Sequence, residues 1–380
     1  MKIAVIGEFE AASHRAHAIN VVKTAGGFAR LGHRVTVLCR APSGEAGADE
    51  PGEMYAEPDL AWRFIPFGSA PGAALGEAAA AYAAELGAEF VYARSFTGAL
   101  RCAELGLATA LETHAYAGDT NPLLLRAFAA TRRAESPLRA LVTISPVLAE
   151  DYTRRGAEGA RVHVVPDGVD VDLFAPPPGR RARPGAGPRA VYAGHLYDYK
   201  GIPTVLGAAR LLPGVAFDLV GGAPEDIQRV RTAAAGSPNV VVRGAVSHAQ
   251  VPAHLWDADV LLLPPSAREP SAGWTSPVKL GEYLAAGPPI VASRIPGLRT
   301  WVDEPAARWF TPDDPADLAR AIGESLAEPP HVSELRRRAA SGLAQRYSYR
   351  SRAEAILHAA GASAVGGTIA LGAAGAQLTG

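Results

Sequence analysis

The feature that most constrains the fold is an alternation of strand-like and helix-like segments. Short β-branched runs such as Lys2–Ile6 and Arg34–Cys39 alternate with Ala-rich segments of helical periodicity such as His17–Leu31. A helix between two strands is the usual crossover of a parallel sheet, and such crossovers are nearly always right-handed. The alternation therefore predicts an α/β fold with parallel strands. In the first half we expect further strands at Phe90–Tyr92, Ala108–Glu112, Ala140–Ile144 and Val162–Val165, and a helix at Glu77–Leu86.

A segment rich in Pro, Gly and Arg divides the chain. Residues Ala175–Pro188 (APPPGRRARPGAGP) contain no periodic apolar run, which is typical of an interdomain linker. The alternation restarts behind this segment. We expect strands at Ala190–Ala193, Ala216–Val220, Val240–Arg243, Val260–Leu263 and Ile290–Ala292, and helices at Gly201–Leu211, Asp226–Ala234, Pro252–Ala258, Ser276–Ala285, Ala316–Leu326 and Glu334–Arg346. The 380 residues thus predict two Rossmann-like, doubly wound domains facing a central cleft, where ligands sit beyond the carboxyl ends of the strands.

Composition excludes several classes of protein. The formal net charge of −1 argues against a general nucleic-acid binder, which carries a basic excess. With two cysteines, Cys39 and Cys102, and no zinc-ligand spacing, neither a disulfide framework nor a structural metal is expected. The start, MKIAVIGEF, is typical of a first strand rather than of a signal peptide, and no run reaches the length of a membrane span. We therefore predict a cytoplasmic protein without integral membrane association, while loose contact with a membrane surface stays open.

The C-terminal segment 361–380 (GASAVGGTIALGAAGAQLTG) is of low complexity and uncharged. This composition is typical of a disordered tail, with binding of a lipid or a partner as the alternative.

Several motifs of common enzyme classes are absent. Gly7-Glu8-Phe9-Glu10 follows the first strand in place of the dinucleotide fingerprint GxGxxG. The chain also contains no GxxxxGK[ST] and no GxSxG. A dehydrogenase, a P-loop NTPase and a serine hydrolase therefore lack their usual sequence support.

Two segments behind strands of the second half suit an anionic ligand. Residues Tyr192–Gly201 (YAGHLYDYKG) follow a strand and open a helix, with Lys200 near the helix N-terminus. Helix amides, the helix dipole and an ammonium all favour a diphosphate there, although Lys200 also suits a surface turn. Gly221-Gly222, behind the next strand, lets a ligand approach the backbone closely or forms an ordinary turn.

The stretch Thr275–Gly287 (TSPVKLGEYLAAG) gives the strongest functional signal. Ser276 followed by Pro277 is typical of a helix N-terminus. Glu282 follows nearly two turns into this helix, where its carboxylate can accept hydrogen bonds from both hydroxyls of a ribose. The alternative is a solvated glutamate on a helix surface.

The ordered set of these segments resembles the family-4 glycosyltransferases. The second half contains GHLYDYKG, DLVGG, VPAHLWDADVLLLP and TSPVKLGEYLAAGPPIVAS, and the first half contains GHRVTVL, FVYARS, ETHA, VTIS and VVPDGVDVDLF. The resemblance covers residues 1 to about 355 and fits the branch with SP-x-KL before its glutamate. It implies the GT-B fold, a nucleotide-diphosphate sugar donor, retention of anomeric configuration and no catalytic metal.

The resemblance also assigns donor-side residues. Lys200 is expected to bind the donor diphosphate and Glu282 the nucleotide ribose. His195 stands where the family more often has Arg, which weakens the cationic binding of the diphosphate unless His195 is protonated or another group helps. The amides around Ser276 and Val278 are expected to face the diphosphate or the sugar, and Arg243–Val246 the base. The full donor-binding set is Gly194, His195, Lys200, Gly221, Gly222, Gly244, Val246, Glu269, Ser276, Val278 and Glu282.

One family position departs from its pattern. The first motif glutamate would fall eight residues before Glu282, where this chain has Trp274. Glu269 is a candidate for its role through a short insertion, or the sugar contacts come from other groups. The identity of the donor sugar stays open for this reason.

In the first half, His114 ends a strand in Glu112-Thr113-His114 and matches a family histidine near the anomeric carbon and the acceptor. An imidazole there can relay a proton, although a histidine at a strand end is also common as a structural residue. Arg94 and the loop Glu8–His17 are expected to face the same cleft. The acceptor-side set is therefore His17, Arg94 and His114, and the catalytic set is His114, Lys200 and Glu282.

These features predict a metal-independent, retaining glycosyltransferase without a cofactor, which moves a sugar from a UDP- or GDP-sugar to a small polar molecule or a glycan. We expect an acceptor-side domain at residues 1–175, a linker at 176–188, a donor-binding domain at 189–346, and a C-terminal helix at about 347–360 that packs back on the first domain. A homodimer is possible, and no nucleic acid is expected as a partner. The alternatives are a GT-B sugar-nucleotide epimerase and a catalytically inactive nucleotide-sugar-binding protein.

Overall fold

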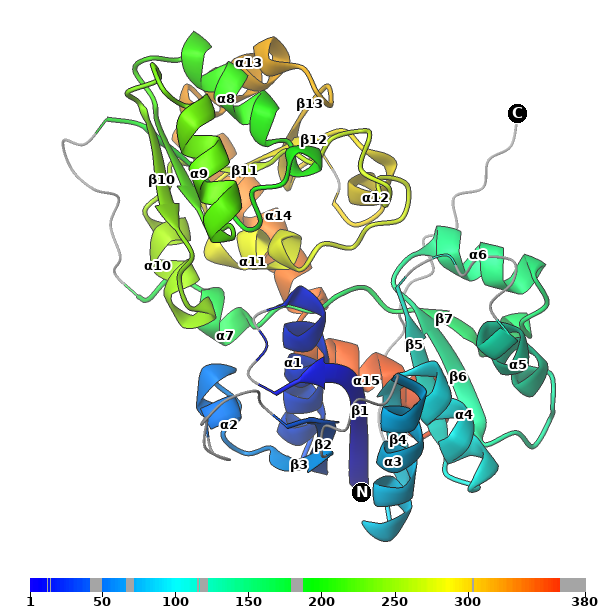
Figure 1. Ribbon diagram of the computed structural model, residues 1–380. Helices are drawn as coiled ribbons and strands as arrows, with labels where there is room; N and C mark the ends of the chain where they lie inside the picture. Colours follow the sequence, from blue (N-terminus) through cyan, green and yellow to red (C-terminus); the bar gives the residue numbers. More distant parts are fainter. Residues whose placement is uncertain are drawn as a thin grey trace, which may run out of the picture.

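The computed structural model describes residues 1–11, 13, 15–41, 50–65, 72–114, 116, 122–178, 187–302 and 304–362. These residues form two α/β units, each a parallel sheet with helices packed against it (Figure 1). Most of the expected tail (363–380) and the middle of the expected linker (179–186) lie outside the described residues.

The N-terminal unit contains a seven-stranded sheet in the order β3-β2-β1-β4-β5-β6-β7 among the described residues. Every neighbouring pair in this sheet is parallel. Its strands are β1 Lys2–Glu10, β2 Arg34–Arg40, β3 Ala61–Ile65, β4 Phe90–Arg94, β5 Thr109–Thr113, β6 Leu138–Thr143 and β7 Val162–Val164. Its helices are α1 Ala16–Arg30, α2 Glu50–Met54, α3 Gly72–Glu85, α4 Phe96–Glu104, α5 Pro122–Thr131, α6 Pro146–Arg154 and the 3-10 turn η1 Gly159–Arg161. The short helix α7 Val171–Phe174 follows them in the chain and packs into the core of the C-terminal unit.

The C-terminal unit contains a six-stranded sheet in the order β10-β9-β8-β11-β12-β13, which has the strand pattern of a Rossmann fold. Its strands are β8 Arg189–Ala193, β9 Ala216–Val220, β10 Val240–Gly244, β11 Val260–Leu263, β12 Ile290–Ser293 and β13 Ala307–Phe310. Its helices are η2 Asp198–Lys200, α8 Ile202–Leu211, α9 Pro224–Ala233, η3 His248–Gln250, α10 Val251–Trp256, α11 Val278–Ala286, α12 Pro296–Arg299, α13 Pro315–Leu326 and α14 Pro330–Arg346, followed by α15 Tyr349–Ala359. Across the described part of the chain, no helix has both the length and the apolar character needed to cross a bilayer.

Successive strand residues fill the two faces of each sheet. In β1, Ile3 and Val5 pack into the core that also holds residues of α1 and α15, whereas Ala4 and Ile6 pack into the core on the opposite face. Because parallel strands are covered on both faces, they consist of continuous apolar residues. Polar side chains that are available for chemistry are therefore expected where the strands end.

The chain crosses between the two units twice, and the crossings are paired. Val169 and Ser348 form a parallel bridge. The amide of Val169 donates to the carbonyl of Tyr347 at 2.9 Å, and the amide of Tyr349 donates to the carbonyl of Val169 at 3.0 Å. Helix α14 packs on α11 of the C-terminal unit, and α15 then packs on α1 of the N-terminal unit. The end of the described chain thus returns to the sheet where the chain began (Figure 1).

The structure corrects the expected elements at several positions. Strand β1 continues to Glu10, so Glu8 lies in a strand rather than in a loop. Helix α11 begins at Val278 instead of Ser276, because Pro277 has an extended backbone (φ −75°, ψ 128°) and is the N-cap. The sequence does not predict β3 and β13, since Arg63 and Arg308 interrupt their apolar runs.

Candidate active site

Three glycines lie where strands β8, β9 and β10 end. Gly194, Gly221 and Gly244 have φ angles of +140°, +113° and +85°, which residues with a side chain rarely adopt. The amide of Gly194 donates to Val220 O at 2.8 Å, and the amide of Gly221 donates to Gly244 O at 2.7 Å. A Cβ on Gly221 would lie 2.4 Å from Gly194 O. The three loops therefore run backbone against backbone, and only glycine permits this. Gly222, with φ +91°, continues the same turn.

Lys200 and Glu269, predicted separately, form an ion pair at this end of the sheet. Lys200 lies in the turn η2 behind β8, and Glu269 lies in the loop behind β11. Lys200 Nζ is 3.0 Å from Glu269 Oε2, and the Ser271 hydroxyl donates to Glu269 Oε1 at 2.9 Å. Both residues line a small pocket, together with Tyr192, Leu263, Pro264, Pro265, Thr275, Pro277 and Lys279. The pocket thus combines cations with one nearly buried carboxylate.

His195 does not supply a permanent positive charge. Its ring stacks on Tyr197, with centroids 5.1 Å apart and planes 6° apart. Burial lowers the pKa of His195, and the positive charges of Lys279 and Lys200 lower it further. The imidazole is therefore neutral at neutral pH, so any cationic grip at this end of the sheet must come from lysine.

Helix α11 carries the expected ribose ligand. Glu282 is buried, and this burial raises the pKa of its carboxyl to about 7 against the opposing charge of Lys279. Its Oε1 lies 3.8 Å from Nδ1 of His248, which follows β10 in the turn η3. Burial, together with the charge of Lys23, lowers the pKa of His248 to about 4. A neutral imidazole and a carboxyl with a near-neutral pKa thus lie together where α11 meets the loop behind β10.

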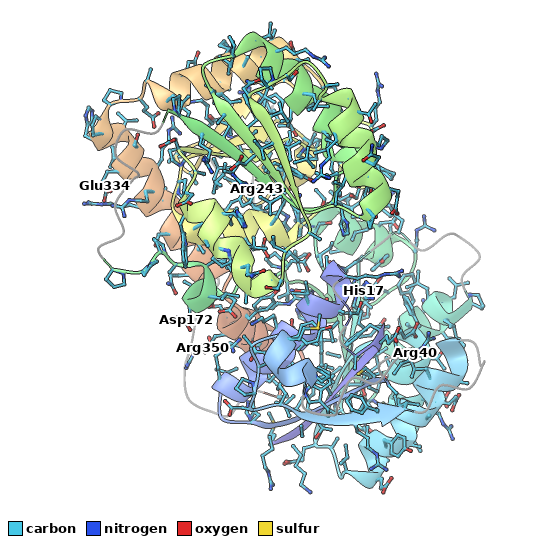
Figure 2. The ribbon with its side chains drawn as sticks, turned by 60° about the vertical axis from the view of Figure 1, so that its left-hand side comes forward. His17, Arg40, Asp172, Arg243, Glu334 and Arg350 are labelled. Atoms are coloured by element: carbon cyan, nitrogen blue, oxygen red, sulfur yellow. The ribbon has the colours of Figure 1, made fainter. Side chains whose placement is uncertain are left out.

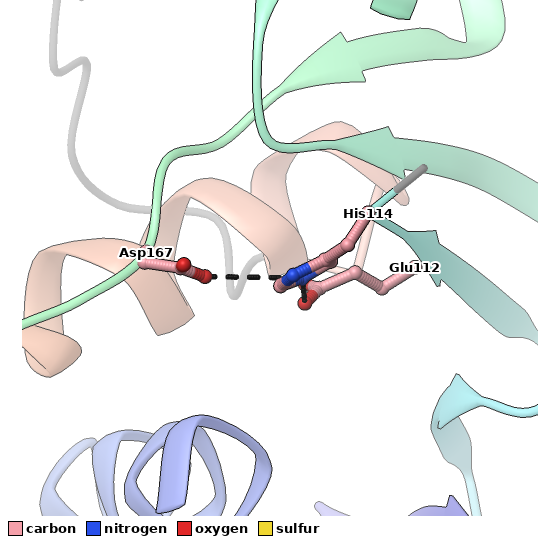
Figure 3. Close-up of side chains that lie close together, drawn as sticks. All are labelled: Glu112, His114 and Asp167. Carbon is pink, nitrogen blue, oxygen red and sulfur yellow. Dashed lines mark hydrogen bonds and ion pairs between the residues drawn. The ribbon is translucent and has the colours of Figure 1, made fainter. Parts of the chain in front are cut away.

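On the N-terminal side, His114 lies directly behind β5 and is held by two carboxylates (Figure 3). Its Nε2 lies 2.5 Å from Glu112 Oε1 and 3.8 Å from Asp167 Oδ1. Burial alone would raise the pKa of Glu112, but the charge of Arg352 and the interactions with His114 outweigh it and lower the pKa to about 2. Because the ionised Glu112 carboxylate can only accept hydrogen bonds, His114 Nε2 is the donor in this contact.

Arg352 of helix α15 completes this cluster. Its guanidinium donates from Nη2 to Glu112 Oε2, and from Nη1 to the carbonyls of Pro166 and, at 2.9 Å, Val165. The Arg352 side chain is 1% exposed and the Glu112 side chain 0%. A buried charge of this kind requires its partner. Through Arg352, helix α15 therefore fixes the position of Glu112, which orients His114, and of the backbone just before Asp167.

The same cluster is a candidate for metal binding by distance alone. Ligand atoms of Glu112, His114 and Asp167 all lie within 4.8 Å of one another. However, Oε1 of Glu112 faces His114 and Oε2 accepts from Arg352, whose positive charge would repel a cation. This donor set fits an oriented imidazole better than a metal centre.

Two contacts connect the segments around this histidine cluster with the segment that leads into α11 of the other unit. The backbone amide of Asp167 donates to the hydroxyl of Ser276 at 3.0 Å, and Ser276 is buried. The rings of Tyr116 and Trp274 meet edge to face, with centroids 4.4 Å apart. Ser276 therefore bridges the units instead of capping α11, and Trp274 closes against the N-terminal unit at the position where a motif glutamate was expected.

The other expected acceptor-side residues lie at the same end of the N-terminal sheet. Arg94 is the last residue of β4, and its Nη1 donates to the carbonyl of His17 at 3.4 Å. His17 lies in the first turn of α1, at the end of the helix that faces the C-terminal unit (Figure 2). Burial lowers the pKa of His17, as does the charge of Arg94. The structure thus brings His17 and Arg94 together, and an electrostatic interaction with His114 lowers the pKa of His17 as well.

The expected base-lining segment is only partly available to a ligand. The Arg243 guanidinium binds Asp218 Oδ2 through Nε at 3.0 Å and Nη2 at 2.8 Å. Arg189 donates to the same oxygen at 2.7 Å. Arg243 is thus tied to strand β9 of the C-terminal unit (Figure 2). Gly244 and Val246, which follow it, remain the candidates for contact with a base.

Sequence reasoning does not assign four charged residues of the site: Glu112, Asp167, Lys279 and Arg352. Three of them stand in segments that already carry a signal, since Glu112 precedes His114 by two positions, Asp167 lies in VVPDGVD and Lys279 lies in SPVKL. Arg352 has no such signal, because its partner is 240 positions away in the chain.

Two protein-family models match the chain, one on each unit. The model described as "Glycosyltransferase Family 4" matches residues 19–173, and the model described as "Glycosyl transferases group 1" matches residues 187–328. The two matches together cover the parts of the chain that carry His114, the glycine turns and α11.

Curated relatives have related descriptions. The chain is 30% identical over 235 residues to the "GDP-mannose-dependent alpha-(1-6)-phosphatidylinositol monomannoside mannosyltransferase" of Mycolicibacterium smegmatis, covering 57% of this chain and 59% of that protein. It is 32% identical over 209 residues to the "D-inositol 3-phosphate glycosyltransferase" of Xylanimonas cellulosilytica, covering 50% of this chain and 49% of that protein. The chain thus spans about half the length of the curated relatives it matches.

Solved structures resemble most of the chain in fold. A glycosyltransferase from Rickettsia africae aligns with a TM-score of 0.73 at 13% identity, covering 94% of this chain and 97% of that one. Anabaena Alr3699/HepE in complex with UDP and glucose aligns with a TM-score of 0.69 at 16% identity, covering 94% and 98%. At these identities the likeness concerns the fold.

Proposed function

The chain belongs to the family-4 glycosyltransferases and has their GT-B fold, and we propose on this premise that it transfers a sugar from a nucleoside-diphosphate sugar to an acceptor. The donor binds mainly to the C-terminal unit, and the acceptor binds mainly to the N-terminal unit. The transfer proceeds with retention and requires neither a metal nor another cofactor.

The observation that carries the proposal is the hydrogen bond from the Asp167 amide to Ser276 Oγ at 3.0 Å. Asp167 also lies 3.8 Å from His114 Nε2. Ser276 directly precedes the N-cap of α11, the helix that holds Glu282. One short chain of contacts therefore joins the candidate donor helix to the candidate catalytic histidine, as a reaction between ligands of two units requires.

For the donor, we assign the diphosphate to Lys200 and to the amides at the start of α11 around Val278, and the ribose to Glu282. The glycine turns at 194, 221 and 222 allow the nucleotide to approach the backbone closely. Gly244 and Val246 face the base, which we expect to be uracil or guanine; the first curated relative is described as GDP-mannose-dependent, and a solved structure of similar fold contains UDP.

For the donor sugar, Glu269 is our candidate for the role of the motif glutamate that Trp274 replaces. Its carboxylate lines the pocket beside Lys200, and its side chain is 9% exposed. A substituted Glu269→Gln enzyme is expected to bind the free nucleoside diphosphate normally but to lose at least tenfold in kcat/KM for the sugar donor. Equal losses for both ligands would exclude this role for Glu269.

For the chemistry, we propose attack of the acceptor hydroxyl on the face of the sugar from which the diphosphate departs. The anomeric carbon–oxygen bond breaks, the acceptor oxygen bonds to that carbon, and the acceptor proton passes to the departing diphosphate. Lys200 and the amides of α11 stabilise the negative charge that develops on the leaving group. His114, oriented by Glu112, lies beside the reacting centre and supports the positive charge that develops on the sugar.

For the acceptor, we propose a small polar molecule. The curated relatives are described as acting on inositol 3-phosphate and on a phosphatidylinositol mannoside, and both molecules contain a polyol ring. His17 and Arg94 offer polar groups of the N-terminal unit for such a ring. We place the reaction in the cytoplasm, and a homodimer remains a prediction that the mass in solution would test.

The test is a thermal-shift screen with UDP, GDP, ADP and dTDP and with their sugars, because a ligand of the folded state raises its stability by mass action. The sugar donors of the nucleotide that binds are then used in turnover assays with EDTA present, and the anomeric configuration of the product is determined by NMR. Substitutions Lys200→Ala and Glu282→Ala are expected to abolish donor turnover. An epimerase would release nucleotide without adding an acceptor, and an inactive binding protein would show a thermal shift without turnover; either result would refute the proposal.

A further inference from the structure

Lysine is rare in this chain, and its placement is informative. Lys2, Lys23, Lys200 and Lys279 are the four lysines among 37 basic residues, so arginine is the ordinary cation of this protein. Two of the four, Lys200 and Lys279, line the same pocket at the carboxyl end of the C-terminal sheet. A lysine differs from an arginine in its compact ammonium and in its ability to lose a proton.

The side chain of Lys279 is held in a fixed position against Tyr192 and Gly194. It lies in the first turn of α11, and its Nζ donates to the hydroxyl of Tyr192 at 2.8 Å and lies 4.1 Å from the centroid of the same ring. A Cβ on Gly194 would lie 2.3 Å from Lys279 Nζ. The ammonium thus occupies the space that any side chain at position 194 would require.

The groups around Lys279 leave it without an anionic partner. Glu269 forms its ion pair with Lys200 at 3.0 Å, and Glu282, on the same helix, lies close to the His248 ring. Among the residues that the structure describes, no carboxylate lies within ion-pair distance of Lys279 Nζ. His195, which the lysines face across the turn behind β8, is neutral at neutral pH. Lys279 can therefore form an ion pair with an anionic ligand.

We propose that Lys279 is the second cation of the donor diphosphate site, where it replaces the arginine that this chain lacks at His195, and that it takes up a proton when the donor binds. The proposal rests on the proposed function, since it assumes a nucleoside-diphosphate donor. Lys200 and Lys279 then hold the diphosphate from two sides of the pocket, with the glycine turn of Gly194 between β8 and the ligand.

The state of the free site agrees with proton uptake. Burial and the charge of Lys200 together lower the pKa of Lys279 to about 7, against the opposing effect of Glu282 and Glu269. At about pH 8 most of the lysine is therefore neutral in the free protein. A bound diphosphate adds negative charge next to it and raises its pKa, so that binding must draw a proton from the solvent.

The test is isothermal titration of the full chain with UDP and with GDP at about pH 8, where both nucleotides are fully ionised. Repeating the titration in buffers with different ionisation enthalpies gives the number of protons taken up. The variants are Lys279→Met, which removes the charge, Lys279→Arg, which keeps a permanent charge, and Lys2→Met as a matched control, because Lys2 lies at the opposite end of β1 from the cleft.

For the unaltered protein we expect an uptake of more than about half a proton per bound nucleotide. Lys279→Met is expected to weaken binding about ten- to a hundredfold, as for the loss of a charge-assisted contact, and to abolish the uptake. Lys279→Arg is expected to bind within about tenfold of the unaltered protein without proton uptake, which a merely structural role would not produce. Lys2→Met is expected to retain both affinity and uptake.

Two outcomes would overturn the inference, and they differ from a failure of the proposed function. If the protein binds a nucleotide and Lys279→Met leaves affinity and proton uptake unchanged, Lys279 is no part of the site, while the proposed function stands. If Glu282→Gln alone abolishes the uptake, the proton belongs to Glu282. If the unaltered protein binds none of the four nucleotides UDP, GDP, ADP and dTDP, the proposed function fails, and the inference fails with it.

Discussion

Arg352 of helix α15 and Glu112 of strand β5 form a buried ion pair, although 240 positions separate them in the chain. Glu112 in turn contacts His114, and Arg352 also donates to the carbonyls just before Asp167. The last described helix thus orients the candidate catalytic histidine through Glu112. We therefore expect the return of the chain to its first sheet to affect catalysis as well as packing.

Replacing Arg352 by Met should strongly destabilise the N-terminal unit. The substitution leaves the Glu112 carboxylate buried without its cation, which costs about 3–5 kcal/mol in comparable cases. Urea unfolding followed by circular dichroism measures this change. The double substitution Glu112→Gln with Arg352→Met should recover part of the loss, because no charge is then left unpaired. A loss below about 1 kcal/mol for Arg352→Met would show that the pair contributes little.

The same ion pair predicts how stability depends on acid. Because the folded-state pKa of Glu112 is lowered from 4.5 to about 2, its contribution is complete above about pH 4.5 and is lost as the pH falls through about 2. The full contribution is on the order of 3 kcal/mol. Free energies of unfolding measured between pH 6 and pH 3 should therefore fall less steeply for Glu112→Gln than for the unaltered protein. Parallel curves for the two proteins would contradict the lowered pKa.

Substitution of His114 separates catalysis from donor binding. His114→Gln keeps a hydrogen-bonding side chain but lacks the imidazole that supports the positive charge developing on the sugar, so kcat is expected to fall about a hundredfold or more. The affinity for the free nucleotide should stay within about threefold, since the donor residues lie in the other unit. Turnover assays measure kcat, and nucleotide titration measures the affinity for the free nucleotide. A change confined to nucleotide affinity would place His114 in the donor site instead.

The fold follows from the sequence because short β-branched runs and segments of helical periodicity occupy separate stretches of the chain. The segment Arg34–Arg40 is apolar enough to be recognised as a strand buried on both faces. The limits of α11 could not be obtained in this way, since Ser276 and Pro277 are typical of a helix start and only the tertiary contact of Ser276 with Asp167 explains why the helix begins at Val278.

The candidate site was predictable only where chemistry and local motif coincide. Lys200 and Glu282 stand in segments with their own signal, whereas the orientation of His114 depends on Arg352, which a local pattern does not reveal. The neutral state of His195 likewise depends on burial and on Lys279 and Lys200, which are neighbours in space. Residues that act together but lie far apart in the sequence could therefore not be predicted, whatever their residue type.

The contact between Tyr116 and Trp274 predicts a coupling between the two units. Edge-to-face aromatic pairs contribute about 0.5–1.5 kcal/mol beyond the burial of their area, and this pair joins opposite sides of the candidate site. Tyr116→Ala and Trp274→Ala should each lower kcat/KM, and a double-mutant cycle should give a coupling energy in this range. Strictly additive effects would show that the contact does not form in the reacting state.

Substitution of Gly221 tests the glycine turn with a matched control in the same unit. Gly221 has φ +113°, and a Cβ on it would lie 2.4 Å from Gly194 O. Gly221→Ala therefore combines backbone strain with a clash against another backbone, and we expect it to destabilise the protein by more than about 1–3 kcal/mol and to abolish nucleotide binding. Gly323 lies within helix α13, and a Cβ on it would meet no atom within 4 Å. Because alanine favours a helix over glycine by about 0.5–1 kcal/mol, Gly323→Ala should stabilise the protein and leave nucleotide binding unchanged. Thermal unfolding and UDP or GDP titration of the two variants measure both effects, and a Gly221→Ala protein that binds nucleotide as well as Gly323→Ala would place the donor site away from this turn.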